Sequence, residues 1–262
     1  MPVSSPGALD DPIAAAAPIV TGRLALHGGG EFLPGDEAFL DALLGAVRAR
    51  PGANGILRVV VVPTAAARGR PDLAASNGVA ALERRAATAG IALSASVARV
   101  VDDGSAADEK TAAEIATADL VYLPGGDPDL IPAILGSSAA GRAMRDAWVR
   151  GATIAGASAG AMALAEWTWT PAGGMAGLGY VPRVAVVPHF DEARRRSWQA
   201  SAERIGPRGV GYLGLDERTG VISSPDGGGA DWLVAGEGAA HWFALGASTP
   251  VVARDGERLS LD

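Results

Sequence analysis

One serine, Ser158, follows a short apolar run and precedes a run of helix-forming residues. Its surroundings, Gly156-Ala157-Ser158-Ala159-Gly160, fit the pattern G-x-S-x-G, in which a strand turns sharply into a helix and exposes the serine hydroxyl at the carboxyl end of a sheet. Small flanking residues permit such a strained turn. The pattern predicts a nucleophilic serine. The competing explanation is a chance match, because the chain contains 36 glycines.

A nucleophilic serine needs a general base, and the chain offers three histidines: His27, His189 and His241. His189 ends an apolar run and lies downstream of Ser158, in the order that elbow hydrolases use. We therefore predict that His189 is the base. His241 lies in an aromatic segment and is interpreted as structural, whereas His27 ends a predicted strand at the edge of the site.

Three glycine-bearing turns each follow a predicted strand: residues 28–30, residues 125–126 and the Ser158 turn. The carboxyl ends of parallel strands meet at one edge of a sheet, so these turns are expected to converge. Gly126 and Ala159 are predicted to donate backbone N–H groups to an oxyanion. The glycines also resemble a phosphate cradle, but neither G-x-G-x-x-G nor a G-K-[ST] ending is present, which leaves nucleotide binding weakly supported.

Alternating strands and helices must position these turns. Predicted strands cover residues 23–27, 56–62, 91–101, 119–123 and 152–155. Predicted helices follow Asp36 and cover residues 72–89, 105–117 (with Ser105 and Asp108 as a capping box) and 131–149. This alternation predicts an α/β fold with an open, mainly parallel sheet and helices on both faces. After residue 184 we expect one strand, a helix near residues 191–205 and extra short strands at the C-terminus.

Length and composition limit the function further. We expect a loose segment over residues 1–21 and a single α/β domain over residues 22–262. The net charge of −7 argues against a nucleic-acid or anionic-membrane partner. The absence of cysteine excludes disulfides and thiolate chemistry, and no acid or histidine cluster has a metal spacing, so we expect no cofactor and no metal. We expect a cytoplasmic protein and leave a homodimer open.

Five motifs together resemble the serine-peptidase family of dipeptidase E (aspartyl dipeptidase) and cyanophycinase. In the family's order they are Gly28-Gly29-Gly30-Glu31, Leu123-Pro124-Gly125-Gly126, Gly156-Ala157-Ser158-Ala159-Gly160-Ala161, Pro188-His189-Phe190 and Gly214-Leu215-Asp216-Glu217-Arg218-Thr219-Gly220. The resemblance implies a fold related to class I glutamine amidotransferases, and hydrolysis of an amide bond next to an aspartyl residue. It also implies that Ser158 is the nucleophile, His189 the base, and Gly126 and Ala159 the oxyanion donors.

The same resemblance suggests where a small peptide or aspartyl-containing substrate binds. The expected contacts are Gly29, Gly30, Glu31, Asp127 and Glu217. Arg194, Arg195 and Arg196 follow the histidine and are natural partners for a substrate carboxylate, because a guanidinium binds carboxylates through two hydrogen bonds. Their spacing does not show which of the three would bind the carboxylate. The alternative explanation is that they form a solvated helix face.

The third catalytic residue of the family is an acid between the serine and the histidine, and Glu166 is the only acid in that interval. On a helix that begins after Ser158, Glu166 would lie about 10 Å along the axis and point away from the site. The residues that could instead orient the histidine are Glu31, Asp127, Asp191, Asp216 and Glu217; a serine–histidine dyad is the remaining option.

The uncertain acid keeps a second function open, a non-catalytic or attenuated amidotransferase-like protein that binds a small molecule or peptide. Two tryptophans just beyond the elbow helix, Trp167 and Trp169, suggest an apolar wall where the family has its acid-bearing segment. Such a wall would change the substrate. As core residues, the two tryptophans need no such role.

Overall fold

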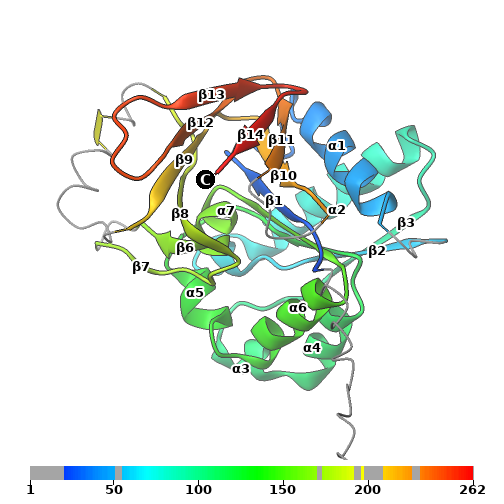
Figure 1. Cartoon of the computed structure of the whole chain (residues 1–262). Helices are drawn as coiled ribbons and strands as arrows, with labels where there is room; N and C mark the ends of the chain where they lie inside the picture. Colours follow the sequence, from blue (N-terminus) through cyan, green and yellow to red (C-terminus); the bar gives the residue numbers. More distant parts are fainter. Residues whose placement is uncertain are drawn as a thin grey trace, which may run out of the picture.

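The computed structural model describes residues 21–50, 55–169, 173–191, 196–197, 209–225 and 231–261. These residues form two sheets, and most of the helices lie against the larger one (Figure 1). The larger sheet has eight strands, in the spatial order β14 (Arg258–Ser260), β11 (Asp231–Gly236), β10 (Thr219–Ser223), β1 (Leu24–His27), β5 (Thr153–Ala157), β4 (Leu120–Leu123), β2 (Leu57–Val61) and β3 (Leu93–Val97).

The strands β1, β5, β4, β2 and β3 run parallel to one another, and β10, β11 and β14 extend the sheet in antiparallel fashion. Every residue of β1, β4 and β5 is buried, as expected for short apolar strands that are covered on both faces. The predicted open, mainly parallel sheet is therefore confirmed. Its parallel strands end at one edge, where the predicted site lies.

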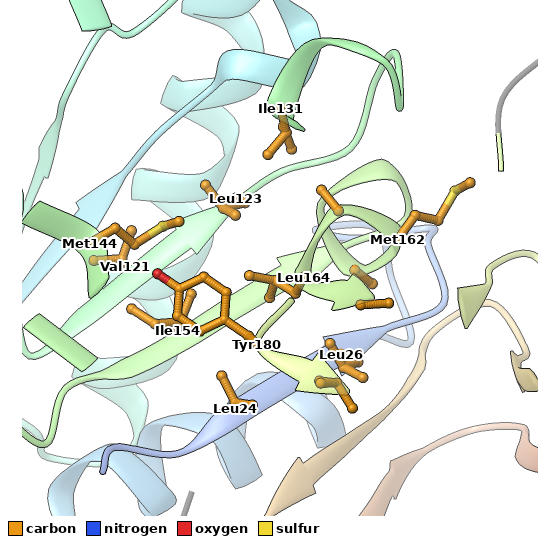
Figure 2. Close-up of a cluster of buried hydrophobic side chains, with 14 of the residues drawn as sticks. Leu24, Leu26, Val121, Leu123, Ile131, Met144, Ile154, Met162, Leu164 and Tyr180 are labelled. Atoms are coloured by element: carbon orange, nitrogen blue, oxygen red, sulfur yellow. The ribbon is translucent and has the colours of Figure 1, made fainter. Parts of the chain in front are cut away.

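Helices cover both faces of this sheet (Figure 1). On one face lie α1 (Glu37–Arg48) and α2 (Pro71–Thr88). The other face carries α3 (Asp103–Ala107), α4 (Glu109–Ala116), α5 (Leu130–Leu135), α6 (Ala139–Val149) and α7 (Ala159–Leu164). Figure 2 shows part of this second core, in which Tyr180 lies between Ile154 of the sheet and Leu164 of α7.

The smaller sheet has six strands, in the order β13 (Val251–Arg254), β12 (Ala239–Phe243), β9 (Gly211–Leu215), β8 (Val181–Val187), β6 (Ala165–Thr168) and β7 (Met175–Ala176). It contains both parallel and antiparallel pairs, which confirms the expected change after residue 184.

The elbow helix differs from the prediction. The elbow helix α7 ends at Leu164 and the chain continues as β6, because residues 165–168 pair with β8 instead of extending the helix.

Two predicted helices are each divided. The helix expected over residues 105–117 consists of α3, α4 and a change of direction between them, and its capping box is formed by Asp102 and Ser105 instead of Ser105 and Asp108. Asp108 begins α4, where its carboxylate accepts the backbone N–H of Thr111. The helix expected over residues 131–149 stops at α5 and restarts as α6, because the Ser138 hydroxyl caps a new first turn.

A short 3-10 helix, η1 (Thr64–Ala66), follows β2. Among the described residues, no helix combines the length and the apolarity that crossing a bilayer requires. Most of the helix expected near residues 191–205, the segment before residue 21 and the glycine-rich residues 226–230 lie outside the described residues. The expected domain boundaries therefore stay a prediction.

Candidate active site

Ser158 stands between β5 and α7 with φ 49° and ψ −111°, a strained conformation for a residue with a side chain. Both flanking glycines are required by close approach. A Cβ on Gly156 would lie 2.4 Å from the carbonyl carbon of Gly160, and one on Gly160 would lie 2.2 Å from the carbonyl oxygen of Leu123. The turn is anchored to the sheet because the Ser158 N–H donates to the carbonyl of His27, over 2.9 Å. The predicted elbow geometry is present.

His189 follows β8 and brings its ring to the serine. The distance from His189 Nε2 to Ser158 Oγ is 3.0 Å, a hydrogen bond between the predicted base and the predicted nucleophile. The backbone of His189 also has a positive φ, 49°. This conformation is held by its N–H, which donates to the carbonyl of Gly28 over 2.6 Å.

An acid completes the series. Glu217 Oε1 lies 2.8 Å from His189 Nδ1, and Glu217 begins the turn between β9 and β10. In the tautomer with the proton on Nδ1, His189 donates to this carboxylate and Nε2 is the ring nitrogen that can accept the serine proton. The Glu217 side chain is 48% exposed and that of His189 31% exposed, so this pair is open to solvent.

Glu166 does not occupy this position. It lies in β6, not on a helix, and its exposed carboxylate accepts the backbone N–H of Arg183 over 2.6 Å. The resemblance implies an acid between the serine and the histidine, but the acid that contacts His189 comes after it in the chain. Glu217 is one of the acids that the sequence offered for orienting His189. The signal for it was the family motif over residues 214–220, which contains it.

The neighbouring acid contacts a different histidine. Asp216 Oδ1 lies 3.1 Å from His241 Nε2, and Asp216 Oδ2 accepts the backbone N–H of Ala239. The His241 ring packs against Phe190, with ring centroids 4.7 Å apart. Asp216 and His241 thus connect the turn that carries Glu217 to β12 and to the residue after His189, in agreement with the structural role predicted for His241.

The glycine turn after β1, residues 28–30, lies directly against His189 and Glu217. Gly29 has φ 105°, and a Cβ there would lie 2.2 Å from Cε1 of His189. A Cβ on Gly30 would lie 3.4 Å from the Arg218 side chain and 3.5 Å from Cβ of Glu217. Gly29 thus lies against His189, and Gly30 lies against Glu217 and Arg218. Their expected contact with substrate stays a prediction.

A buried polar pair supports that glycine turn, and no sequence motif pointed to it. His27 and Asp36 are both almost fully buried, with 2.9 Å between His27 Nε2 and Asp36 Oδ1. The Gly29 N–H donates to His27 Nδ1, and Asp36 Oδ2 accepts the N–H of Phe32. Asp36 thus precedes α1 without capping it by its side chain.

Burial raises the pKa of the Tyr122 phenol, and the negative charges of Asp36 and Glu31 raise it further.

The two predicted oxyanion donors are the backbone N–H groups of Gly126 and Ala159. Gly126 and Ala159 line the same cleft as Ser158. Ala159 is the first residue of α7, so no residue four positions earlier in that helix accepts its N–H. Gly126 has φ 152° and donates no backbone hydrogen bond within the described chain. Both N–H groups are therefore available as donors beside Ser158, and their role toward an oxyanion stays a prediction.

Glu31 fixes the loop that carries Gly126. Its Oε1 accepts the N–H of Gly125 over 2.8 Å, and both Glu31 Oε1 and Ser158 Cβ lie beside the Gly125 α-carbon. The neighbouring Asp127 is held by other partners, since its N–H donates to the carbonyl of Ala65 and its carboxylate pairs with Arg68. Neither acid is among the described residues that line the cleft.

We predict that Glu31→Ala lowers kcat about tenfold to a hundredfold with little change in KM, because the Gly126 donor is misplaced rather than lost, and loss of a whole donor costs about 10²- to 10³-fold. Glu31→Gln keeps a carbonyl oxygen for Gly125 and is expected to retain most of the activity. Steady-state kinetics of both variants measures the difference. Equal losses in the two variants would show that the charge of Glu31, and not its hydrogen bond, is what matters.

The cleft beside Ser158 has a volume of about 410 Å³, within the usual range for a ligand pocket. Its described lining is Gly126, Pro128, Ser158, Ala159, Met162, Trp169, Val186, Val187, Pro188, His189 and Ser197. None of these carries a carboxylate, an ammonium or a guanidinium group. Of the two tryptophans, Trp169 lines the cleft, whereas Trp167 packs into the small cluster with Ala185 and Val210.

The arginines expected to bind a carboxylate are only partly described. Arg196 is exposed and is not among the cleft-lining residues. Arg194 and Arg195 lie outside the described residues. In the part of the chain that the structure describes, no group of three histidine, aspartate or glutamate side chains could hold a metal ion.

Comparison with known proteins identifies relatives of this chain. The model of peptidase family S51 matches residues 24–224. A peptidase from an acI-B1 actinobacterium has a similar structure, with a TM-score of 0.74, 25% identity, and 93% of this chain and 98% of that chain covered. A candidate peptidase E from Listeria monocytogenes EGD-e shares the fold, with a TM-score of 0.53, 13% identity, and coverage of 89% and 98%. No curated protein sequence matched.

Proposed function

The chain belongs to peptidase family S51 and is therefore a serine-type peptidase, and we propose that Ser158, His189 and Glu217 are its catalytic triad. The observation that carries this proposal is the hydrogen-bonded series Glu217–His189–Ser158, with distances of 2.8 and 3.0 Å. A serine hydroxyl is a weak nucleophile until a base removes its proton, and a base is most effective when a third group orients it.

In the proposed reaction, Ser158 Oγ attacks the carbonyl carbon of an amide while its proton passes to His189 Nε2. The N–H groups of Gly126 and Ala159 stabilise the negative charge on the carbonyl oxygen. The tetrahedral intermediate then collapses, the C–N bond breaks and His189 returns the proton to the leaving nitrogen. A water molecule, deprotonated by His189, hydrolyses the acyl ester and frees Ser158. Glu217 stabilises the imidazolium in both steps.

For the substrate we propose an amide bond next to an aspartyl residue. The support is the resemblance of the motifs around Gly126, Ser158 and His189 to those of aspartyl dipeptidase and cyanophycinase. Hydrolysis of Asp-Xaa dipeptides, β-aspartyl-arginine and cyanophycin tests this, with Ala-Xaa dipeptides as the matched comparison. Equal rates for aspartyl and alanyl substrates would reject the aspartyl preference but leave the triad in place.

A fluorophosphonate probe separates this function from the binding-only alternative, because only an activated serine reacts quickly with it. We expect rapid labelling of the chain, detected by intact mass, and none in Ser158→Ala. The binding-only alternative rests on the lack of a well-placed acid between Ser158 and His189, and the 2.8 Å contact between Glu217 and His189 supports catalysis instead. A wild-type protein that stays unlabelled would support binding without catalysis.

A further inference from the structure

The reaction chemistry places the leaving residue of the substrate next to His189. After Ser158 attacks, the imidazolium must protonate the leaving nitrogen, so that nitrogen lies within hydrogen-bond reach of His189 Nε2. The residue that departs with this nitrogen therefore begins on the side of the cleft that is built by the segment leading into His189. Its side chain contacts whatever lines that side.

Two neighbouring strands supply that lining. β6 and β8 run parallel with Trp167 opposite Ala185, so their carboxyl ends reach the same edge of the smaller sheet. Trp169 follows β6, and β8 continues through Val187 and Pro188 to His189. We define the apolar wall as four cleft-lining residues at the ends of these strands: Val186 and Val187 in β8, Pro188 directly after β8, and Trp169 directly after β6.

The apolar wall presents carbon atoms to the cleft. The indole nitrogen of Trp169 is buried and has no hydrogen-bond partner, so the accessible part of this side chain is its ring carbons. Met162, a buried residue of α7 at the margin of the core, also lines the cleft with its thioether side chain, which Figure 2 shows directed away from Tyr180. A charged side chain placed here would lose its water without gaining a partner from the described lining, which costs free energy.

We propose that the apolar wall is the subsite for the leaving residue and that it selects a large apolar side chain there, such as leucine, methionine or phenylalanine. This inference rests on the proposed serine mechanism, because that mechanism places the leaving nitrogen at His189. Removing such a side chain from water is expected to raise kcat/KM about tenfold to a hundredfold over serine or lysine at the same position.

The test uses dipeptides with one fixed acyl residue, aspartyl in one series and alanyl in another, followed by leucine, phenylalanine, serine or lysine. For the wild-type chain we expect leucine and phenylalanine to exceed serine and lysine in kcat/KM by about tenfold or more. Trp169→Ala is expected to reduce this ratio, and Trp169→Glu to raise lysine relative to leucine. Trp148→Phe, on α6 and outside the cleft, is the control and should keep the wild-type ratio.

Fluorophosphonate labelling of Ser158 checks that each variant is folded and also supplies a second measurement. Leucinamide, which resembles the leaving residue, should slow wild-type labelling more than serinamide does. Ser158-dependent hydrolysis without a leucine preference, or labelling that leucinamide does not slow, would overturn the subsite and leave the mechanism standing. A wild-type chain that neither labels nor cleaves any dipeptide would overturn the mechanism and the subsite together.

Discussion

Ser158→Ala is expected to lower kcat about 10⁶-fold, to the level left by binding and the oxyanion donors alone, as found when a triad serine is removed in a well-studied protease. The reason is that the acyl ester forms on Ser158 Oγ, and alanine offers no atom to replace it. Binding should change little, because the removed hydroxyl contacts His189 and the substrate carbonyl rather than the substrate side chains. The measurement is kcat for the best dipeptide substrate.

A matched control for this variant is Ser76→Ala, which removes an exposed hydroxyl from α2 that bonds only to its own helix. It should behave as wild type. Activity that survives in Ser158→Ala at more than about a thousandth of the wild-type value would reject covalent catalysis by this residue, since residual triad-free catalysis is far weaker.

Glu217→Gln is expected to lower kcat about 10³-fold. Removing the orienting carboxylate of a triad costs about 10⁴-fold where that acid is buried, because the histidine adopts the wrong tautomer and its imidazolium loses a counter-charge. The Glu217 side chain is 48% exposed, so water can replace part of this stabilisation and the loss should be smaller. KM should change little, since Glu217 is not among the described residues that line the cleft.

Glu166→Gln provides the comparison, because Glu166 is the only acid between Ser158 and His189 in the sequence. Its carboxylate bonds to the Arg183 backbone and does not contact His189, so kcat should remain near the wild-type value. A larger loss in Glu166→Gln than in Glu217→Gln would contradict the triad. The rate of fluorophosphonate labelling should follow the same order, which separates activation of the serine from substrate binding.

The elbow could be read from the sequence because its requirements are local. Gly156 and Gly160 are needed by backbone atoms a few residues away or on the adjacent strand, and the strained turn places Ser158 at a strand end wherever the chain alternates strands and helices. The same argument brought residues 28–30 and residues 125–126 to the edge where Ser158 stands. Alternation within a parallel sheet fixes which ends of its strands meet.

Elements set by pairing between distant strands were harder to predict. Residues 165–168 follow a helix-forming run, yet they form β6 because β8 is available to pair with them. Only the resulting smaller sheet brings Trp169 and Val187 to one side of the cleft. The local pattern of apolar residues does not say which distant strand will pair with a segment. Trp167 and Trp169 therefore suggested an apolar wall, but the sequence did not show where in the cleft it lies.

The sequence by itself determined the parallel sheet and which serine and which histidine stand at its edge, because these follow from short motifs and from the order of strands and helices. The tertiary structure decided which acid contacts that histidine. Asp216 and Glu217 are adjacent in the chain, and the path of the turn after β9 directs one to His241 and the other to His189. Their side chains diverge because β12 pairs with β9 on one side while the Gly29 turn holds the His189 ring on the other, and neither contact is local in sequence.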